Sequence, residues 1–545
     1  MKKKNDLKIK GRLETPFKLC LYTFIISLSL IYIIFRIFFT LPLRFGVPTA
    51  ILGIFILVLE IIEFLDYFNF YLNVLCYNKH SPKIPKVKKS LLPEVDVFIA
   101  TINESVDLVE GTIKACLKMK YPNKKKIHIY ICDDGHRKEM EDLAKKYNIG
   151  YITRNDNKDA KAGNYNNALK HSYSPYIATL DADMQPTPEF LMTTMPFFVK
   201  EKRVGFVQLP QSFSNPDIYQ LRFGLTDEIP FEQDYFYTRI QIAKNNTNSA
   251  IYCGTNAVLS REALESVNGF SINNVTEDIA TGMAIESKGY RGIALTNIEA
   301  YGDAVNDLES YAKQQSRWAR GGIQILKKQK ILTNDGLSLR QKAEYLSAIF
   351  HWYYGVRRVI YFIMPLLFSF FGILVIDCNL IVFCAFFFPP FLLKRFGLDL
   401  LEYKKKSATW CLICEVVMAP FMALTVLKET FGAPNSRWDV SPKNKINTTM
   451  TKTNRFFLIC HSFFLLLSIL GLGVTFYRIY TLELYAYILP LIWISGNIFY
   501  LTVAVIFDLR LKPVYYENFV PNKATKYSLK SIPMIFTSIF RKKMN

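Results

Sequence analysis

Residues 175–183 read PYIATLDAD, and residues 127–135 read IHIYICDDG. Each stretch is a short apolar run, as expected of a buried β-strand, and each ends in two carboxylates. Similar runs at 95–101, 204–209 and 289–295 alternate with helical patterns, which predicts an open α/β sheet. Ligands of such sheets bind beyond the carboxyl ends of the strands, so the sequence predicts a binding site around these acidic residues.

The two acidic clusters are more informative together than apart. One cluster alone is more often an ordinary acidic turn after a strand. Asp133-Asp134 and the alternating pair of Asp181 and Asp183 are expected, however, to meet at one edge of one sheet. In extended chain, D-x-D points both carboxylates to the same side. Hard oxygen ligands of this kind suit Mg²⁺ or Mn²⁺, which also bind substrate phosphates.

Two further motifs are ambiguous when each is taken alone. Thr276-Glu277-Asp278 precedes a helical stretch and could be a helix cap with acids in the first turn. Gln314-Gln315-Ser316-Arg317-Trp318 could belong to a basic amphipathic helix on a membrane surface. Only their order along the chain, together with the acidic clusters, gives them weight as site residues.

The composition indicates a membrane protein. The chain has 545 residues, with 67 Lys and Arg against 46 Asp and Glu, a net charge of +21, and half of the residues are hydrophobic. This combination argues against a soluble nucleic-acid binder and against disorder, and it places basic charge beside anionic lipid. The ten cysteines lack the spacing of a disulfide framework, and Cys411 with Cys414 is not interpreted as a zinc or redox site.

Apolar stretches predict about six membrane spans around a large polar block. The spans are expected at 19–35, 47–77, 359–376, 378–393, 456–477 and 484–507. Residues 409–427 are also apolar, but basic residues flank both ends, so this stretch is interpreted as an interfacial or re-entrant helix. The chain is then expected in the plasma membrane, with the polar block and both termini on the cytoplasmic side. Glu60, Glu63 and Asp66 share one helix face and should avoid lipid.

The motifs occur in an order that resembles the family 2 processive glycosyltransferases, and most closely the cellulose synthases. The series begins with Thr101 and Asn103-Glu104, continues through D-D-G, Lys161–Asn164, D-A-D and Cys253–Asn256, and ends with T-E-D and Q-x-x-R-W. The resemblance runs from about Pro93 to Ile325. Trp438–Lys443 is also similar to the gating loop of cellulose synthases. The fold class implied is an α/β nucleotide-sugar glycosyltransferase domain of GT-A type, cytoplasmic and inserted in an α-helical transmembrane domain with interfacial helices.

The resemblance implies a role for each motif. The residues that would bind the nucleotide sugar are Thr101, Glu104, Asp133, Asp134, Lys161 and Arg317. Asp181 and Asp183 would hold Mg²⁺ or Mn²⁺ on the diphosphate. In the catalytic T-E-D motif, formed with Glu277, Asp278 would be the base. The acceptor would contact Gln314, Trp318, Thr255 and Asn256, and the gating loop would contribute Trp438, Ser441 and Lys443.

These chemical roles agree with the residue types. A metal ion and an arginine can neutralise the leaving group, and one carboxylate can deprotonate the acceptor hydroxyl. One base without a second nucleophilic carboxylate implies a single, inverting displacement. An indole surface suits a sugar ring, and flanking spans could carry a polar chain that cannot cross hydrocarbon unassisted.

The expected domain order follows from the motifs and the spans. Residues 1–78 hold the cytoplasmic N-terminus and two spans, and 79–325 form the glycosyltransferase domain. An interfacial amphipathic helix at 326–350 leads into 351–427, with two spans and an interfacial helix. The remaining segments are the gating-like loop at 428–455, two spans at 456–507 and a cytoplasmic tail at 508–545.

The donor expected is UDP-glucose, and the product is a β-glucan such as cellulose, with the nascent polysaccharide and the lipid bilayer as partners. Because Gln211, Ser212, Gln315, Trp438 and Ser441 depart from the usual cellulose synthase pattern, a mixed-linkage (1,3;1,4)-β-glucan synthase is an open alternative. A poly-N-acetylglucosamine-type synthase, a non-processive glycosyltransferase and a nucleotide-sensing transporter are further alternatives.

About forty residues follow Phe507, too few for a cyclic-di-GMP-binding barrel, so no direct cyclic-di-GMP activation is expected. No nucleic-acid partner is expected either.

Overall fold

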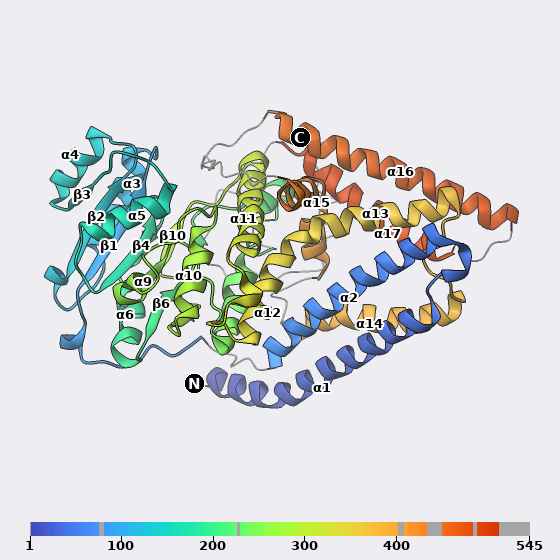
Figure 1. Ribbon diagram of the computed structural model, residues 1–545, viewed down its shortest axis with the longest axis horizontal. Helices are drawn as coiled ribbons and strands as arrows, with labels where there is room; N and C mark the ends of the chain where they lie inside the picture. Colours follow the sequence, from blue (N-terminus) through green and yellow to red (C-terminus); the bar gives the residue numbers. More distant parts are fainter. Residues whose placement is uncertain are drawn as a thin grey trace.

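A mixed β-sheet covered by helices on both faces forms one end of the molecule, and a bundle of long helices forms the other (Figure 1). The computed structural model describes residues 2–75, 81–225, 229–401, 408–432, 449–482 and 488–511. Between the two ends stands α11 (Leu308–Lys328), which carries the Q-x-x-R-W motif. This helix therefore lies between the α/β sheet and the bundle of long helices.

The main sheet has seven strands in the order β3-β2-β1-β4-β8-β6-β9. The strands are β1 (Val95–Thr101), β2 (Ile127–Asp133), β3 (Gly150–Ile152), β4 (Tyr176–Asp181), β6 (Val204–Gln208), β8 (Ala257–Ser260) and β9 (Arg291–Ala294). All five strands expected from the apolar runs are present. The strand that the sequence analysis missed in the centre, β8, pairs antiparallel with both β4 and β6, so the sheet is mixed.

The strand register explains why the motifs converge. Thr101 at the end of β1 pairs with Asp133 at the end of β2, and Ala100 pairs with Asp181 at the end of β4. Because these neighbours are parallel, their carboxyl ends lie at one edge. Since β8 runs the opposite way and begins at Ala257, the preceding Cys253–Asn256 loop reaches the same edge.

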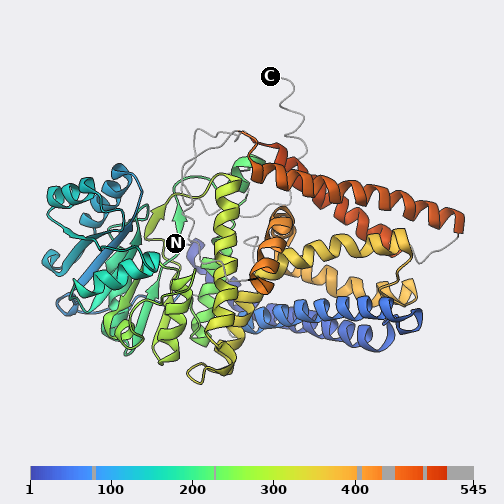
Figure 2. The ribbon, with the colours of Figure 1, turned by 45° about the horizontal axis from the view of Figure 1, so that its top comes forward.

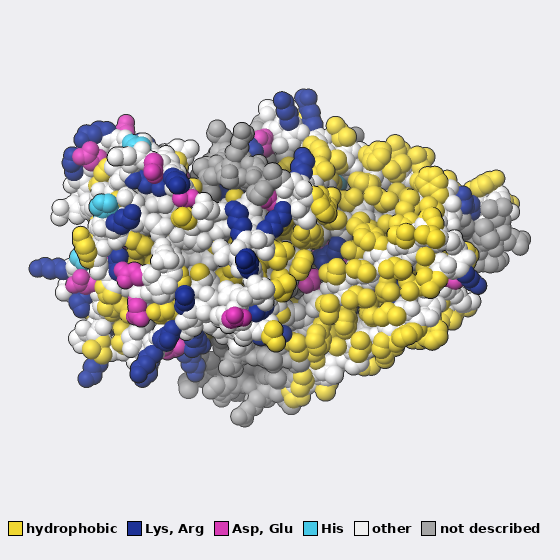
Figure 3. Space-filling model, viewed as in Figure 1, with side chains coloured by type: hydrophobic (Ala, Val, Ile, Leu, Met, Phe, Trp, Pro, Cys, Tyr) yellow, Lys and Arg dark blue, Asp and Glu magenta, His cyan; other side chains and the backbone are white. Residues whose placement is uncertain are grey.

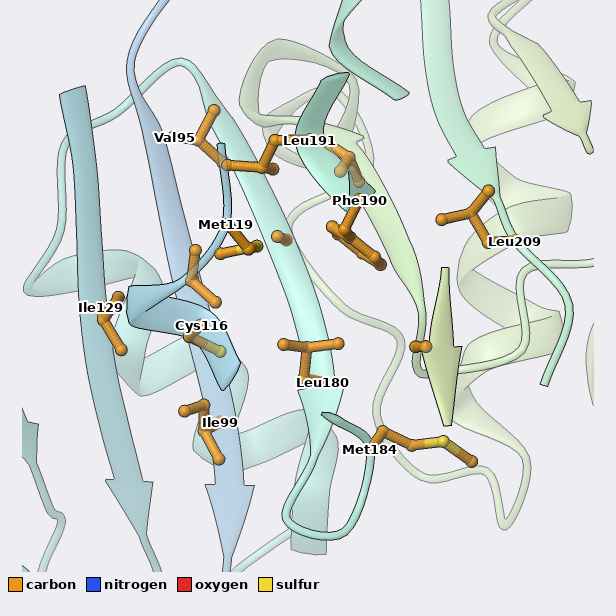
Figure 4. Close-up of a cluster of buried hydrophobic side chains, with 14 of the residues drawn as sticks. Val95, Ile99, Cys116, Met119, Ile129, Leu180, Met184, Phe190, Leu191 and Leu209 are labelled. Atoms are coloured by element: carbon orange, nitrogen blue, oxygen red, sulfur yellow. The ribbon is translucent and has the colours of Figure 1, made fainter. Parts of the chain in front are cut away.

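Helices cover both faces of this sheet. On one face, α3 (Val106–Leu117), α4 (Lys138–Tyr147) and α6 (Phe190–Lys200) enclose a core that includes Ile99, Leu180 and Phe190, as Figure 4 shows. On the other face, α5 (Ala160–Lys170), α9 (Arg261–Glu265) and α10 (Glu277–Ser287) pack over Phe98 and Phe206. Because strands that are buried on both faces are apolar almost throughout, the apolar runs of the sequence predicted them.

Smaller elements connect the sheet to the bundle. A three-stranded sheet has the order β5-β10-β7, from Gln185–Pro186, Ala300–Gly302 and Ser212–Phe213. Two short helices are α7 (Ile218–Phe223) and α8 (Gln241–Lys244). An amphipathic helix expected within 326–350 is present as α12 (Leu339–Phe350), which Ser338 begins through a capping box with Gln341.

Six long helices of the bundle run alongside one another: α1 (Lys2–Phe39), α2 (Val47–Leu75), α13 (Tyr354–Phe371), α14 (Leu380–Leu401), α16 (Lys452–Leu482) and α17 (Ile488–Leu509). A seventh, α15 (Ala408–Phe431), runs across them between α11 and α13 (Figure 2). On the face that Figure 3 shows, hydrophobic side chains cover most of the bundle, whereas charged side chains gather over the α/β domain. The chain is therefore a multi-pass membrane protein.

Length and composition select six described helices as able to cross a membrane, at Leu19–Phe45, Val47–Leu72, Leu339–Phe371, Thr409–Phe431, Lys452–Thr481 and Ile488–Leu509. This set contains α15 and omits α14, the reverse of the sequence interpretation. In the fold, however, α14 packs along α1, where the rings of Phe35 and Phe386 stack at 4.1 Å, while α15 lies across the bundle. The interfacial assignment of α15 stays a prediction, because by length and composition this helix could also span the membrane.

Charged residues inside the bundle are paired across helices. The pairs are Arg36 with Glu60 at 2.8 Å, Arg357 with Asp66 at 3.3 Å and with Glu63 at 4.0 Å, and Arg358 with Glu415 at 2.7 Å. Isolated charges in hydrocarbon are costly, so each acid turns to an arginine of a neighbouring helix. The three carboxylates of α2 thus contact arginines, whereas their avoidance of lipid stays a prediction, since the side chains of Glu63 and Asp66 are 38% and 32% exposed.

Candidate active site

A cavity of about 700 Å³ opens where the carboxyl ends of β1, β2 and β4 meet α10 and α11. Its lining includes members of every motif that the sequence analysis singled out within the described residues: Thr101, Glu104, Asp134, Lys161, Asp181, Asp183, Cys253, Glu277, Asp278, Gln314, Arg317 and Trp318. Residues more than two hundred positions apart therefore form one site. Its volume suits a nucleotide sugar with part of an acceptor.

One end of the cavity is organised by hydrogen bonds around Thr101. Its Oγ1 donates to Glu104 Oε2 at 2.7 Å and accepts from Arg137 Nη2 at 2.7 Å. Glu104 also accepts the backbone N–H groups of Ile102 and Asn103 at 2.8 and 3.3 Å. This network fixes the loop after β1 as a rigid wall with polar groups directed to the cavity.

Asp133 and Asp134 are adjacent in sequence, but only one of them lines the cavity. Asp133 is completely buried and does not line the cavity; its carboxylate accepts from the backbone N–H of Gly135 and of Arg137, at 3.0 and 2.8 Å. Asp134 lines the cavity and is held by Arg154 in a two-point ion pair, with both N–O distances at 2.7 Å. A nucleoside can reach Asp134, whereas Asp133 shapes the turn that presents it.

The D-x-D carboxylates lie at the centre of the cavity. Asp181 Oδ1 is 2.5 Å from Lys161 Nζ, which also donates to the carbonyl of Gly254 at 2.8 Å. Asp183 Oδ2 accepts the backbone N–H of Asp303 at 3.4 Å. Burial opposes the charged form of Lys161, but Asp181 and other nearby acids outweigh it and raise the pKa of the ammonium group.

The donor set fits a divalent cation only if the substrate completes it. Among the described residues, no group of three or more His, Cys, Asp or Glu side chains could hold a metal ion on its own. Two carboxylates facing one cavity nevertheless provide the hard oxygens that Mg²⁺ or Mn²⁺ prefers, with water and phosphate oxygens as the usual further ligands. The site therefore suits a cation that arrives with a diphosphate.

The T-E-D motif places two carboxylates at the start of α10. The side chain of Thr276 makes no capping hydrogen bond, so the motif is not the simple helix cap that its sequence allowed. Asp278 Oδ1 accepts the backbone N–H of Ile279 at 2.8 Å, and its other oxygen lies beside Gly254. Burial raises the pKa of Asp278, and burial together with the charge of Asp278 raises the pKa of Glu277. A carboxylate in this environment is a stronger base than in water.

Several residues of α11 line the cavity, among them three of the Q-x-x-R-W motif. Gln314, Arg317 and Trp318 line it, whereas Gln315 is buried on another side of the helix. Asp307 begins α11 by accepting the N–H of Ser310 at 2.9 Å. The ring of Trp318 lies 6.4 Å from that of Trp352, which supports it from the membrane side. A cation and an indole on one helix can therefore face the leaving group and a sugar ring.

Some predicted site residues lie elsewhere. Thr255 and Asn256 are completely buried and do not line the cavity. Thr255 Oγ1 accepts the N–H of Asp181 at 2.9 Å, and Asn256 Nδ2 donates to the carbonyl of Pro210 at 3.3 Å. These side chains support the D-x-D turn, and Cys253 is the residue of that loop which lines the cavity. Trp438, Ser441 and Lys443 of the gating-like loop lie outside the described residues.

Residues that the sequence analysis did not single out also belong to the site. Glu232 and Tyr311 line the cavity, and burial raises the pKa of Glu232 to about 7, assisted by the nearby charge of Asp217. Arg154 holds Asp134, and Arg137 donates to Thr101. Neither arginine belongs to a recognisable motif, and Glu232 lies in an unpatterned segment, so only the fold reveals them.

Comparison with known proteins gives consistent matches. Residues 96–268 match the family model described as glycosyl transferase family 2, and residues 265–409 match the one described as cellulose synthase. The cellulose synthase catalytic subunit (UDP-forming) of Xanthomonas axonopodis pv. citri is 36% identical over 318 residues, which are 58% of this chain and 44% of that protein. Cellulose synthase 1 catalytic subunit (UDP-forming) of Komagataeibacter xylinus is 30% identical over 472 residues, 85% of this chain and 63% of that protein.

The chain spans about half the length of the curated relatives it matches. Among solved structures, the mannosyltransferase PcManGT from Pyrobaculum calidifontis, in complex with GDP-Man and Mn²⁺, is 18% identical with a TM-score of 0.47. The alignment covers 70% of this chain and 99% of that one.

Proposed function

Because the chain is cellulose synthase-like in sequence from its first sheet strand to its membrane bundle, we propose that it is a membrane-embedded, processive, inverting glycosyltransferase. It polymerises UDP-glucose into a β-glucan and moves the polymer across the membrane. The observation that carries the proposal is that D-x-D, T-E-D and R-W side chains line one cavity beside the helical bundle. Relatives named UDP-forming cellulose synthases support the choice of donor.

The nucleotide of the donor binds at the carboxyl ends of β1 and β2. Asp134, fixed by the two-point contact with Arg154, accepts hydrogen bonds from the base or the ribose, and Thr101 and Glu104 form the adjoining wall. Because both oxygens of Asp134 are already held by a nearly buried guanidinium, no reorganisation of that carboxylate is needed on binding. Asp133 keeps the turn in place without touching the nucleotide.

Asp181 and Asp183 would hold Mg²⁺ or Mn²⁺ together with the diphosphate, and the ion would supply neutralisation of the leaving-group charge. Lys161 contacts Asp181 at 2.5 Å and adds positive charge near the same oxygens. Arg317 lines the same cavity and would face the diphosphate of the departing UDP. Charge that develops on the leaving group is thus met by fixed cations of the protein.

Asp278 is the general base for the acceptor hydroxyl. Burial raises its pKa, while the N–H of Ile279, Lys161 and Arg317 oppose that rise, so the carboxylate is a stronger base than a carboxylate in water. Only one carboxylate acts at the reacting carbon, so an α-linked donor gives a β-linked product. Glu277 adjoins this group as the first residue of α10, and burial together with the charge of Asp278 raises the pKa of Glu277.

The acceptor end of the polymer stacks on Trp318, whose indole is supported by Trp352 at the membrane side. From there the chain continues into the bundle formed by α1, α2, α13, α14, α16 and α17, which we assign as the six spans, with α12 and α15 at the interface. The α/β domain and the basic N-terminus then lie in the cytoplasm.

Purified full-length protein in liposomes, supplied with Mg²⁺ or Mn²⁺ and radiolabelled UDP-glucose, tests the proposal. We expect high-molecular-weight polymer that cellulase digests and lichenase does not. Characteristic lichenase oligosaccharides would instead identify a mixed-linkage β-glucan. Polymer from UDP-N-acetylglucosamine alone, or transfer of a single sugar, would contradict the assigned function.

A further inference from the structure

Two adjacent glycines lie in the second half of α11, the helix that carries the acceptor tryptophan. Gly321 and Gly322 are both buried, and the helix continues through them to its last turn. A glycine inside a helix is less favourable than an alanine, because it loses more conformational freedom on folding. A close backbone contact that only glycine permits would offset this cost.

Gly321 makes such a contact with the T-E-D motif. A Cβ added to Gly321 would lie 2.7 Å from the Cβ of Thr276, and closer still to the Oγ1 and Cγ2 of that threonine. Packed carbon atoms lie about 3.5–4.0 Å apart, so the added atom would require a displacement of about 1 Å. No side-chain rotation moves the Cβ of Thr276. The backbone of one of the two segments would therefore have to shift.

Gly322 differs from Gly321 in its surroundings. A Cβ added to Gly322 would lie 3.4 Å from Cδ1 of Trp352, which is an ordinary van der Waals distance. The same substitution therefore finds room one position further along the helix. The crowding is specific to the side of α11 that meets Thr276.

The contact of Gly321 with Thr276 connects the acceptor platform to the base. Trp318 precedes Gly321 by three residues, so both lie on one side of α11, and Thr276 precedes Asp278 by two. Trp318, Thr276 and Asp278 all line the cavity. Asp278 is confined in turn by Gly254, where an added Cβ would lie 3.2 Å from its Oδ2. A shift of α11 at Gly321 would therefore change the separation between the indole and the base.

Two more contacts hold α11 beside the T-E-D segment. Ile325, about one turn after the glycines, belongs to a buried cluster with Ala280 and Met283 of α10. Lys328, in the last turn of α11, donates to the carbonyl of Asn273 at 2.5 Å. Because these contacts fix the end of α11, crowding at residue 321 would mainly displace the preceding half, which carries the acceptor tryptophan.

We propose that Gly321 is a positioning residue: its lack of a side chain lets α11 approach Thr276 and thereby sets the distance between Asp278, the base, and Trp318, the acceptor platform. The consequence for polymer synthesis rests on the proposed glucan synthase activity, whereas the contact itself does not.

The proposal predicts a change in the fate of the donor. In transfer, the acceptor hydroxyl attacks the anomeric carbon, the bond to the UDP oxygen breaks and the hydroxyl proton passes to Asp278. Water can make the same attack without stacking on Trp318, and it then releases free glucose and UDP. A displaced α11 should therefore impair transfer to the polymer more than hydrolysis.

A double-mutant cycle on the thermal stability of the full-length protein in lipid nanodiscs tests the contact without any activity. Gly322→Ala should keep or raise the melting temperature, because alanine favours the helix. Gly321→Ala should lower it by several degrees, because the added methyl group overpacks the contact. In a Thr276→Gly background, which removes the opposing Cβ, this loss should disappear. An equal rise at both glycines, or the same loss in both backgrounds, would refute the contact.

The products formed from radiolabelled UDP-glucose test the consequence. We expect Gly321→Ala to lower incorporation into polymer on the order of 10²-fold, the effect of a misplacement of about 1 Å, with a smaller loss of hydrolysis and unchanged UDP affinity. Gly322→Ala is the matched control and should retain wild-type incorporation. Wild-type incorporation by Gly321→Ala, or a parallel loss of incorporation, hydrolysis and UDP binding, would overturn the positioning role. A wild-type protein that makes no polymer would instead contradict the proposed function, and the stability cycle would still decide the contact.

Discussion

Replacing Asp278 with asparagine tests the base while leaving the site almost intact. The asparagine Oδ1 can keep the 2.8 Å hydrogen bond from the N–H of Ile279. Lys161 retains its contacts with Asp181 at 2.5 Å and with the carbonyl of Gly254 at 2.8 Å. Because burial raises the pKa of Asp278, the neutral amide also removes an unfavourable buried charge. Folding and donor binding should therefore survive.

What the variant loses is the ability to take a proton from the acceptor hydroxyl. General-base catalysis contributes about 10²–10⁴-fold, or about 3–5 kcal/mol of the barrier. We expect turnover of UDP-glucose into polymer to fall by that factor, while the UDP dissociation constant stays within about twofold of the wild type. Glu277→Gln makes the same change of charge one residue away and should have a smaller effect.

Initial rates of polymer formation in liposomes, with calorimetric titration of UDP on the same preparations, separate the two quantities. A loss of less than tenfold, or full polymerisation by Asp278→Asn, would show that another group accepts the proton. A parallel loss of UDP affinity would place Asp278 in donor binding instead of catalysis.

Other predictions concern the acceptor, the loop and the pH dependence. Trp318→Ala should shorten the products, since a stacked sugar loses about 1–3 kcal/mol of contact, and gel filtration of labelled polymer measures this; wild-type lengths would contradict it. Gly254→Ala should lower turnover, because φ is +77° and the added Cβ would lie 3.2 Å from Asp278 Oδ2; unaltered kinetics would contradict it. Burial raises the pKa of Glu232 from 4.5 to about 7, so its stabilising effect is complete below pH 4.5 and is lost as pH rises through 7. At pH 8, Glu232→Gln should accordingly increase the free energy of unfolding by roughly 1–2 kcal/mol, which thermal denaturation would detect as a higher melting temperature. An unchanged or lower melting temperature at that pH would argue against this reasoning.

The sequence predicted the main sheet because its strands are buried on both faces and read as apolar runs. It did not reveal β8, whose four residues, Ala257–Ser260, carry too short a pattern, nor its antiparallel direction. That direction has a consequence for the site: it brings Cys253 to the cavity and buries Thr255 behind it. Burial of a polar side chain beside a motif cannot be read from spacing alone.

The sequence also did not indicate which side chains reach the site only through tertiary contacts. Arg154 meets Asp134 from twenty positions away, and Glu232 reaches the cavity from a segment without periodicity. Basic residues flank both ends of α15, a signal that does not depend on packing, and the interfacial placement that they predict stays a prediction. Local patterns thus indicated the elements and the reacting groups, whereas supporting contacts required the tertiary structure.

Synthesis coupled to export is the central claim, and a protection assay in proteoliposomes tests it most directly. Radiolabelled UDP-glucose is added outside, where only outward-facing catalytic domains can use it, and cellulase is then added with or without detergent. The account predicts polymer that resists cellulase until detergent opens the vesicles. Polymer digested completely without detergent, or label found only on single sugars, would contradict the claim that one chain both builds and transports the glucan.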